Sequence, residues 1–514
     1  MRSTRAIVVG AGIGGLTAAA DLARAGLEVT VLERAAGPGG RMRRQGTDSA
    51  PIDAGPTVFT MRWVFEALFE DAGRSLDAAL DLERLDVLAR HHWQDGGVLD
   101  LYEDVERSAD AIGRLCGAAD ADGYRRFARD TERVFDVLDA PFMRAQRPDP
   151  VRLTLDVGLT RIADLIATRP FETLWRALGD YFADPRLRQL FGRYATYCGA
   201  NPFAAPATLM LIAHAERAGV WRVKGGMYEL ALAIERLGRE LGARHVYEAP
   251  VARLEVARGR VVAAVTDDGT RHEADLVVFN GDAAALLEGL LGTEARAALG
   301  HQRPPPRSLS AVTFTGGTRV SGFPLAHHTV LFSRDYQAEF GAIDARGRPA
   351  EDPTVYICAQ DRADDGALLP GTDLDAERLL LLVNARADGD RGHYDEATIE
   401  AIREDMLCRL WKSGLALTPT QWTVTTPADF EAAFPATGGA LYGRAIHGFM
   451  ASFQRPGART KIANLYLAGG SAHPGAGVPM VATSGRLAAA AALTDLTSTS
   501  MSIATATSGG ISTG

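Results

Sequence analysis

Three glycines near the start of the chain stand at a spacing that could hold a phosphate group. Gly10, Gly12 and Gly15 follow the apolar run "AIVV" and open "LTAAADLARAG", a pattern typical of a helix that ends in glycine. Gly10 permits a tight turn, Gly12 lets the backbone approach a pyrophosphate, and Gly15 lets helix and strand pack closely. The phosphates would lie at the helix N-terminus. An ordinary glycine-rich turn is the alternative; a signal peptide is disfavoured because no small-residue cleavage site follows.

A carboxylate and an arginine continue this pattern. Glu33 ends "EVTVLE", eighteen residues beyond Gly15, where dinucleotide-binding folds place an acidic group on a ribose hydroxyl. Because Glu33 would repel a 2′-phosphate, NADP is disfavoured. The next residues, "RAAGPGGR", bring three glycines that end at Gly40 and then Arg41, which can neutralise pyrophosphate charge. The alternative is a flexible surface loop with a solvated arginine.

A second strand, glycine turn and helix lie near the C-terminus, in "NLYLAGGSAHPGAGVPMVATSGRLAAAAAL". The helix would start near "GVPMVATSG", where unpaired backbone N–H groups face a ligand. Aimed at the N1–C2=O edge of a flavin, such a terminus stabilises the negative charge that develops on reduction. A small-residue helix packed on the sheet, without a ligand, is the alternative.

The elements that must position these residues alternate along the chain. Helical periodicity dominates residues from about 95 to 220, and strands return after them, with a turn at Asp268-Gly269 and a buried strand "ADLVVFN". We predict an α/β fold with a Rossmann-like dinucleotide-binding domain, discontinuous in sequence, and an inserted substrate domain of mixed sheet and helices. The expected parts are the nucleotide domain at 1–95, 221–300 and 436–496, a helical insertion at 96–220, a second-domain sheet at 301–435, and a disordered tail at 497–514.

Composition narrows the classes of function. The 514 residues have a mild net charge of -9, which disfavours nucleic acid as a partner. The four cysteines, Cys116, Cys198, Cys358 and Cys408, have no metal-ligand spacing, so we expect buried thiols in a reducing cytoplasm and no metal. No apolar run reaches the roughly eighteen residues of a membrane-spanning helix, so membrane contact would be peripheral.

Taken together, the segments above resemble the bacterial carotenoid desaturases, FAD enzymes of the phytoene desaturase and amine oxidase superfamily. The motif "HPGAGVP" is much more specific to these desaturases than the glycine fingerprint. "AGPTVFTMRWVFEALF" and "DPRLRQLFGRYATYCGANPFAAPATLMLIAHAE" look most like the hydroxycarotenoid (methoxyneurosporene) 3,4-desaturase branch. The resemblance covers nearly the whole chain except the tail.

The resemblance implies a set of FAD-binding residues. The ADP moiety and pyrophosphate would be held by Gly10, Gly12, Gly15, Glu33, Gly40 and Arg41. Gly55, Pro56 and Thr57 would lie near the isoalloxazine, and Val251 in "APVARLEV" would contact adenine through its backbone. The site would be completed by Asn280, Leu441, Gly470, Gly477, Val478 and Met480. Where many amine oxidases carry an acidic residue after the glycine of the last strand, this chain has Gly470, so a ribityl contact made there by a carboxylate must be replaced.

The implied activity is that of an FAD-dependent oxidoreductase acting on CH–CH groups. A flavin can accept a hydride at N5, and the implied substrate is an acyclic, hydroxylated or methoxylated neurosporene-type carotenoid desaturated at C3–C4 in an apolar tunnel. Electrons would pass on to oxygen or a quinone, and the protein would be cytoplasmic, at the inner face of the membrane. The alternatives are a phytoene desaturase, an amine oxidase, and a lipid-binding escort protein without redox chemistry.

No residue is assigned as catalytic. His473 in "SAHPG" is a candidate acid or base, but a turn histidine that hydrogen-bonds the backbone is equally compatible, and the pairs His91-His92 and His327-His328 have no acidic metal-binding context. In "LTRIADLIATRPFETLWRALGDYF", Trp175 and Phe182 alternate with arginines, which suggests either a membrane-facing surface or a helical core with solvated arginines, Arg161, Arg169 and Arg176. The resemblance favours the membrane.

Overall fold

The part of the chain that carries the glycine fingerprint forms a five-stranded parallel sheet. The computed structural model describes residues 3–47, 50–147, 149–158, 167–300, 305–346 and 349–507. In spatial order the strands are β10 (Arg244–Val246), β2 (Glu28–Leu32), β1 (Arg5–Val9), β14 (Leu276–Phe279) and β20 (Leu465–Leu467). Every neighbouring pair is parallel, and the runs are almost wholly buried. Strands from three separated parts of the chain therefore build one sheet.

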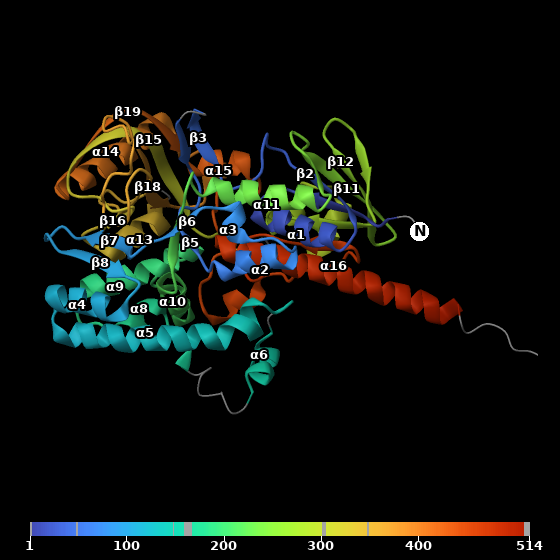
Figure 1. Cartoon of the computed structure of the whole chain (residues 1–514), viewed down its shortest axis with the longest axis horizontal. Helices are drawn as coiled ribbons and strands as arrows, with labels where there is room; N and C mark the ends of the chain where they lie inside the picture. Colours follow the sequence, from blue (N-terminus) through green and yellow to red (C-terminus); the bar gives the residue numbers. More distant parts are fainter. Residues whose placement is uncertain are drawn as a thin grey trace, which may run out of the picture.

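Different elements cover the two faces of this sheet. Helices α1 (Ile13–Arg24), α11 (Tyr228–Glu240) and α16 (Val478–Thr507) pack on the face that carries Val8 and Val278 (Figure 1). The opposite face, with Ile7 and Val277, packs on a three-stranded antiparallel sheet and two short helices. These are β11 (Val251–Ala257), β12 (Arg260–Thr266), β13 (Arg271–Glu273), α12 (Ala283–Glu288) and η5 (Glu294–Leu299). The turn between β12 and β13 holds Asp268-Gly269, as the sequence predicts.

A second sheet, of seven strands, forms the other half of the molecule. Its order is β19 (Leu415–Thr425), β15 (Ser310–Gly322), β18 (Glu377–Ala385), β17 (Val355–Ala359), β16 (His328–Leu331), β7 (Val87–His92) and β8 (Val98–Tyr102). The pair β16–β7 is parallel and the others are antiparallel. Helix α14 (Glu396–Lys412) packs on one face of it, and α13 (Tyr336–Arg346) lies beside it.

This sheet corrects one predicted boundary. Strands β7 and β8 lie on either side of residue 95, the expected end of the first nucleotide-domain segment, yet both belong to the second sheet. Strand β7 is recruited by parallel pairing with β16, more than two hundred residues later in the chain. Local periodicity carries no information about such pairing, so the sequence could predict two strands but not their sheet.

The helical insertion lies beneath the seven-stranded sheet in Figure 1. It comprises α4 (Val105–Cys116), α5 (Ala118–Leu138), η1 (Asp139–Met143), α6 (Pro150–Val157), α8 (Leu174–Leu178), α9 (Pro185–Gly192), η3 (Arg193–Cys198), η4 (Ala207–Met210) and α10 (Leu211–Arg217). An aromatic cluster holds it together, because Phe127, Phe182 and Phe191 lie within 5.4 Å of one another, centroid to centroid.

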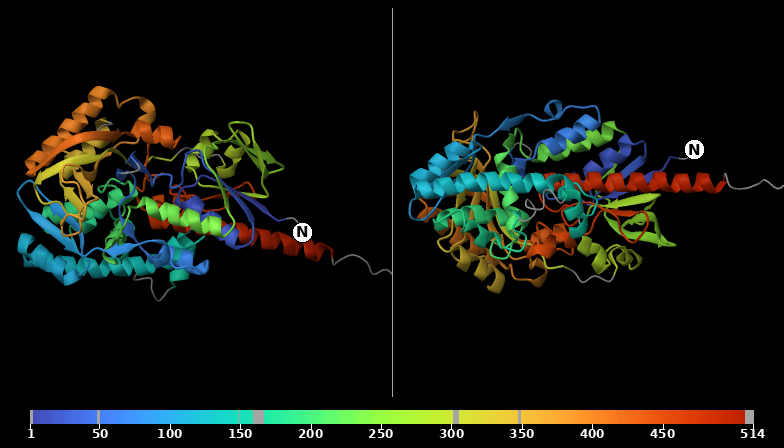
Figure 2. Two further views of the ribbon diagram at one scale, coloured as in Figure 1. Left: turned by 45° about the horizontal axis from the view of Figure 1, so that its top comes forward. Right: turned by 90° about the horizontal axis from the view of Figure 1, so that it is seen from below.

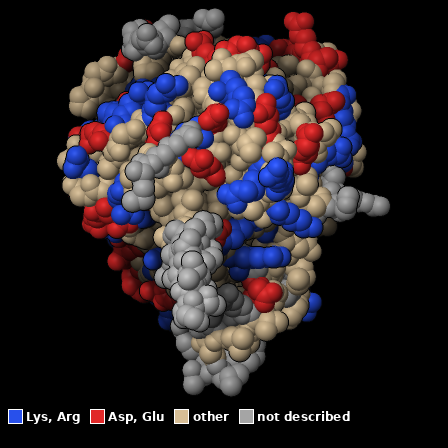
Figure 3. Space-filling view, turned by 90° about the vertical axis from the view of Figure 1, so that its right-hand side faces the viewer, with Lys and Arg blue, Asp and Glu red and all other residues tan. Residues whose placement is uncertain are grey.

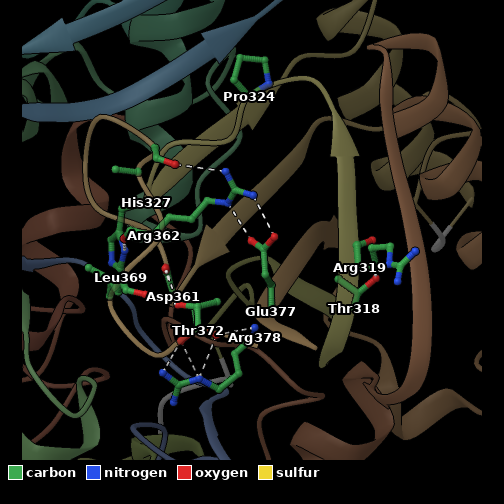
Figure 4. Close-up of polar contacts among 12 residues, drawn as sticks. Thr318, Arg319, Pro324, His327, Asp361, Arg362, Leu369, Thr372, Glu377 and Arg378 are labelled. Carbon is green, nitrogen blue, oxygen red and sulfur yellow. Dashed lines mark hydrogen bonds and ion pairs between the residues drawn. The ribbon is translucent and has the colours of Figure 1, made fainter. Parts of the chain in front are cut away.

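Short elements lie between the two sheets. They are β3 (Arg44–Thr47), β4 (Ala50–Asp53), β5 (Phe59–Thr60), α2 (Trp63–Asp71), α3 (Leu76–Ala79), β6 (Leu82–Arg84), β9 (Val220–Val223), η6 (Gly389–Arg391), α15 (Pro427–Ala433) and η7 (Phe449–Gln454). Where β17 ends and β18 begins in the second sheet, Arg378 pairs with Asp361 at 2.6 Å, and Arg362 pairs with Glu377 (Figure 4). Arg378 also donates to the carbonyl oxygen of Pro51 at 2.8 Å, and this bond fastens the β3–β4 hairpin to the second sheet.

Two further expectations differ from the structure. Helix α16 continues to Thr507, so it includes residues 497–507 of the segment expected to be a disordered tail; residues 508–514 lie outside the described part. In Figure 2 its C-terminal half runs clear of the body of the molecule. The expectation of four buried thiols is correct for Cys358 and wrong for Cys408, which is exposed on α14, while Cys116 and Cys198 are half-buried; all four are free.

The surface shows no segregation of charge on the face drawn in Figure 3, where acidic and basic side chains are interspersed. Among the described residues, no helix is both long enough and apolar enough to cross a membrane.

Candidate active site

A cavity of about 1230 Å³ lies between the two sheets. Its walls come from all three nucleotide-domain segments, from the seven-stranded sheet and from the helical insertion. The predicted site residues that line it are Gly10, Gly12, Glu33, Gly40, Arg41, Gly55, Pro56, Thr57, Val251, Asn280, Leu441, Gly470, Gly477 and Val478. The fold therefore brings together residues that stand more than four hundred positions apart.

The two predicted site residues outside this lining are Gly15 and Met480. A Cβ on Gly15 would run into the carbonyl oxygen of Gly10, so Gly15 serves the close contact of α1 with β1 that the sequence predicts. Met480 packs instead in a small apolar cluster with Met61 and Phe135 of the insertion. Its expected contact with the cofactor stays a prediction that the cavity lining does not support.

The glycine turn leaves room for a phosphate. Gly10 has a φ of +98°, a conformation that favours glycine, and Asn280 Nδ2 donates to its carbonyl oxygen at 3.3 Å. A Cβ on Gly12 would stand 2.8 Å from the same amide nitrogen. Side chains on the fingerprint glycines would therefore collide with Asn280 or with the backbone of the turn and disturb the start of α1.

Glu33 stands at the carboxyl end of β2 and is 7% exposed. Its Oε2 accepts from the backbone N–H of Ala11 at 2.6 Å, and its Oε1 accepts from Ala35 N–H at 2.8 Å. A carboxylate has about four lone-pair sites, so two remain for the hydroxyl groups of a ribose. The backbone amides fix the carboxylate in place and leave it able to accept from a ligand.

Two half-buried arginines in the cavity wall form no ion pair with a carboxylate among the described residues. Arg41 Nη2 donates to the carbonyl oxygen of Ala440 at 3.0 Å, and its guanidinium stacks 4.7 Å from the ring centroid of Phe434. Its Nε has no partner within the described part of the chain, and neither have Nε and Nη2 of Arg43, which stacks on Phe430. Burial lowers the pKa of both guanidinium groups. Uncompensated positive charge in a cavity fits a pyrophosphate, so these residues suit FAD.

Arg43 is a lining residue that the sequence reasoning missed. It follows Arg41 by two positions in "GGRMR", and both side chains reach the cavity. Sequence periodicity could not single it out, because residues 41–43 lie outside any strand and Met42 between the two arginines lines the cavity as well.

The other end of the cavity carries a hydrogen-bonded chain. The hydroxyl groups of Thr57 and Tyr356 are 2.6 Å apart, and Tyr356 Oη lies 2.8 Å from His328 Nδ1. Burial lowers the pKa of His328 well below its ordinary value, so the imidazole is neutral. Arg193, Tyr197 and Glu216 line the same cavity from the helical insertion. Tyr356 and these three residues were not predicted.

An arginine is hydrogen-bonded to the backbone at the position after the last strand, and how a ribityl contact is replaced there stays a prediction. Gly470 carries no side chain, and its carbonyl oxygen accepts from Nη1 of Arg455, which is 3% exposed. The acidic residues among the described cavity lining are Glu33, Glu216 and Asp282. Helix α16 begins at Val478, beside Gly477, so its N-terminus faces the cavity as the sequence predicts.

The candidate histidines lie elsewhere. His473 is buried outside the cavity lining, and its Nε2 donates to the carbonyl oxygen of Phe142 at 2.8 Å, so it is a turn histidine bound to backbone. His91 and His92 are buried in β7. His327 Nδ1 donates to the carbonyl oxygen of Arg362 (Figure 4), and its Nε2 lies 4.0 Å from Cys358 Sγ.

The segment considered as a membrane surface is partly core and partly surface in its described part. Phe182 is 1% exposed and Trp175 packs on Phe203 with ring centroids 4.5 Å apart, whereas Phe171 is 86% exposed. Arg169 pairs with Asp180, and Arg176 is solvated, whereas Arg161 lies outside the described residues. A helical core with solvated arginines describes Trp175 and Phe182 but not Phe171, so membrane contact stays a prediction.

Comparison with known proteins defines the class of protein. Residues 13–493 match the family described as flavin containing amine oxidoreductase. An oxidoreductase from Methanosarcina mazei superposes with a TM-score of 0.58 at 16% identity, covering 94% of this chain and 99% of that one. A putrescine oxidase bound to putrescine gives a TM-score of 0.57 at 15% identity, covering 96% and 99%. At such identity the likeness concerns the fold alone.

Sequence relatives define the branch. The chain is 47% identical to a hydroxyneurosporene desaturase of Rubrivivax gelatinosus, over 100% of this chain and 98% of the relative. It is also 47% identical to a hydroxyneurosporene desaturase of Cereibacter sphaeroides, over 96% of this chain and 99% of the relative. A phytoene dehydrogenase of Streptomyces griseus is 33% identical, over 94% of each chain. The chain therefore belongs to the flavin-containing amine oxidoreductase family and, within it, to the carotenoid desaturases, and its cofactor is FAD.

Proposed function

We propose that the protein is an FAD-dependent desaturase that introduces a C=C bond at C3–C4 of an acyclic carotenoid with a terminal hydroxyl or methoxyl group. The observation that carries this proposal is full-length identity of 43 to 47% to three hydroxyneurosporene desaturases. The cavity supports it, because its apolar wall, with Val58, Ile212, Leu380 and Leu382, suits a polyene.

Different residues of the chain bind different parts of FAD. Arg41 and Arg43 hold the pyrophosphate, Glu33 accepts from the ribose, and the N-terminus of α16 faces the ring system. When bound, FAD supplies a hydride acceptor. The cavity wall holds the reacting carbons in place and excludes water, and we assign no side chain as acid or base.

The test is conversion of two substrates in one liposome preparation. We expect 1-hydroxyneurosporene to lose two hydrogens, with a red shift of its absorption, and phytoene to stay unchanged. Conversion of phytoene instead would place the enzyme early in desaturation, and no conversion of either would favour an amine oxidase or a lipid-binding protein. Repeating the assay without oxygen, with and without a quinone in the bilayer, distinguishes the two proposed electron acceptors.

We also propose that the protein meets its substrate at the inner face of the membrane. Val151, Leu155 and Phe171 support this, because their side chains are 68%, 73% and 86% exposed around a single stretch of the insertion. In a flotation assay with lipid vesicles, replacing all three by serine should reduce the bound fraction while FAD content is retained. Equal binding by the variant would contradict the proposal.

A further inference from the structure

A buried polar cluster stands in the wall of the cavity that the helical insertion provides. Arg193 opens η3, and its Nη2 donates to Tyr197 Oη at 3.2 Å. Tyr197 Oη donates to Glu216 Oε1 of α10 at 2.7 Å, and Tyr194 donates to the other carboxylate oxygen. Each carboxylate oxygen therefore accepts one hydrogen bond, and the cluster links η3 to α10.

Arg193 is the member of this cluster with hydrogen-bonding capacity to spare. Its side chain is buried, it lines the cavity, and its Nε has no partner within the described part of the chain. No carboxylate among the described residues lies within ion-pair distance of it, since Glu216 is reached through Tyr197. An unsatisfied buried donor is costly, so a ligand that brings an oxygen to this point is favoured over one that brings a methyl group.

The cluster lies at the flavin end of the cavity rather than at a remote end of a tunnel. The element that carries Arg193 packs against two residues of that end: a Cβ on Gly199, directly after η3, would run into the ring of Tyr442, and Tyr356 packs on the apolar cluster that includes Tyr194 of η3. Tyr356 is hydrogen-bonded to Thr57, and Tyr442 follows Leu441, two of the residues expected near the FAD. Arg193 is thus a neighbour of the groups that surround the reacting carbons.

The chemistry of the proposed substrate requires an oxygen in this place. In a C1-hydroxylated polyene that is desaturated at C3–C4, one carbon separates the hydroxyl-bearing carbon from the reacting bond. When that bond lies against the flavin, the oxygen must therefore lie beside it. A hydrocarbon substrate would present methyl groups there and would leave the guanidinium unsatisfied.

We propose that Arg193, held in place by Tyr197 and Glu216, donates a hydrogen bond to the terminal oxygen of the substrate and so selects oxygenated over hydrocarbon polyenes. This inference rests on the proposed function. Because the substrate oxygen acts as acceptor, a methyl ether is accepted as well as an alcohol. Arg193 is a specificity-determining residue, and Tyr197 is a positioning residue that acts through it.

The test compares 1-hydroxyneurosporene with neurosporene, which lacks the hydroxyl, in one liposome preparation. For Arg193→Met we expect kcat/KM for the hydroxylated substrate to fall by about 100-fold, as for loss of one hydrogen bond from a buried charged donor, and kcat/KM for neurosporene to stay equal or rise. Binding gives a second measurement. With the flavin reduced no turnover occurs, and the absorption shift of 1-hydroxyneurosporene on binding can be titrated. The variant should need a higher concentration than the wild type to reach half of this shift. Arg217→Met on α10, whose guanidinium pairs with Glu132 outside the cavity, is the matched control and should leave the substrate ratio unchanged.

Several outcomes would overturn the inference. If the wild-type enzyme converts neurosporene as fast as 1-hydroxyneurosporene, the role proposed for Arg193 is wrong, although the desaturase function stands. If it converts neither substrate, the proposed function itself is contradicted. An Arg193→Met variant with normal flavin content that loses activity equally on both substrates shows a structural role instead. If that variant is recovered without flavin, Tyr197→Phe decides: it should lower the ratio by about 10-fold through KM, as for one neutral hydrogen bond, and an unchanged ratio refutes the proposal.

Discussion

Arg41 is a cation in the cavity wall that forms no ion pair among the described residues and is expected to bind the pyrophosphate of FAD. We expect Arg41→Met to weaken FAD binding by about 10- to 100-fold, because a hydrogen bond from a charged donor contributes roughly 1.5–3 kcal/mol. The apoprotein should be as stable as the wild type or more so, because the substitution removes an unpaired buried charge. Fluorescence titration with FAD and urea unfolding of the apoprotein measure the two effects.

Because Arg41→Met is expected to weaken FAD binding without lowering the stability of the apoprotein, the two measurements distinguish a role in binding from a role in folding. Arg74→Met is the control, since Arg74 forms an exposed pair with Glu240 at 3.0 Å and such pairs contribute little. It should change neither quantity appreciably. An Arg41→Met apoprotein that unfolds at lower urea with unchanged FAD affinity would assign Arg41 a packing role.

At the scale of elements, helices α1 and α16 make a close contact in the nucleotide domain. A Cβ on Gly485 of α16 would run into the Gly14 carbonyl oxygen and the Thr17 hydroxyl on α1. We expect Gly485→Ala to lower the free energy of unfolding by about 1–3 kcal/mol, as overpacking does, and to weaken FAD binding because both helix N-termini face the cofactor. Thermal unfolding with and without FAD measures both.

The matched control is a helical glycine with open space around it. Gly341 of α13 is exposed, and a Cβ there would meet nothing within 4 Å. Gly341→Ala should therefore raise the free energy of unfolding by about 0.5–1 kcal/mol through helix propensity. If both substitutions stabilise the protein, the contact of α1 with α16 is looser than the structure shows.

The same scale explains what the sequence could predict. Strand β1, helix α1, strand β2 and their glycines were predictable because the local pattern and the role of each residue agree, and the structure places Gly10, Glu33 and Arg41 in one cavity. The membership of β7 in the second sheet was not predictable from the sequence, because it depends on pairing with β16, which lies far along the chain. Arg193 and Tyr356 reach the cavity from an insertion and from that sheet, so only the assembled fold reveals them.

At the scale of the whole molecule, buried ionisable groups set a pH range for stability. Burial lowers the pKa of His91 to about 3 and the pKa values of His327 and His473 to about 4, and raises the pKa of Glu339 to about 7. The histidines lie in β7, before β16 and in the turn before α16, so their protonation affects both halves of the fold.

The two kinds of group have opposite signs. Folding favours neutral histidines, so the stability they contribute is complete above their unfolded pKa of about 6.5 and is lost as the pH falls towards 4, at about 3 kcal/mol or more for each. Folding also favours the protonated form of Glu339, whose contribution is complete below the unfolded pKa of 4.5 and is lost as the pH rises through 7. The free energy of unfolding should therefore be greatest near pH 6 to 6.5. The stability lost when the three histidines are protonated together approaches the roughly 5–15 kcal/mol stability of a typical protein, so the protein should unfold between about pH 5 and 4.

Urea unfolding at closely spaced pH values between 4.5 and 8.5 measures this profile, and two variants assign its limbs. Glu339→Gln should flatten the alkaline limb, because the amide cannot lose a proton. His91→Phe keeps a flat ring beside Trp93 and Phe332 and should make the acid limb shallower, although it costs about 1 kcal/mol at every pH by removing the hydrogen bond to the carbonyl oxygen of Leu99. A wild-type midpoint that increases steadily from pH 4.5 to 8.5 would contradict the opposing contributions assigned to the buried histidines and to Glu339.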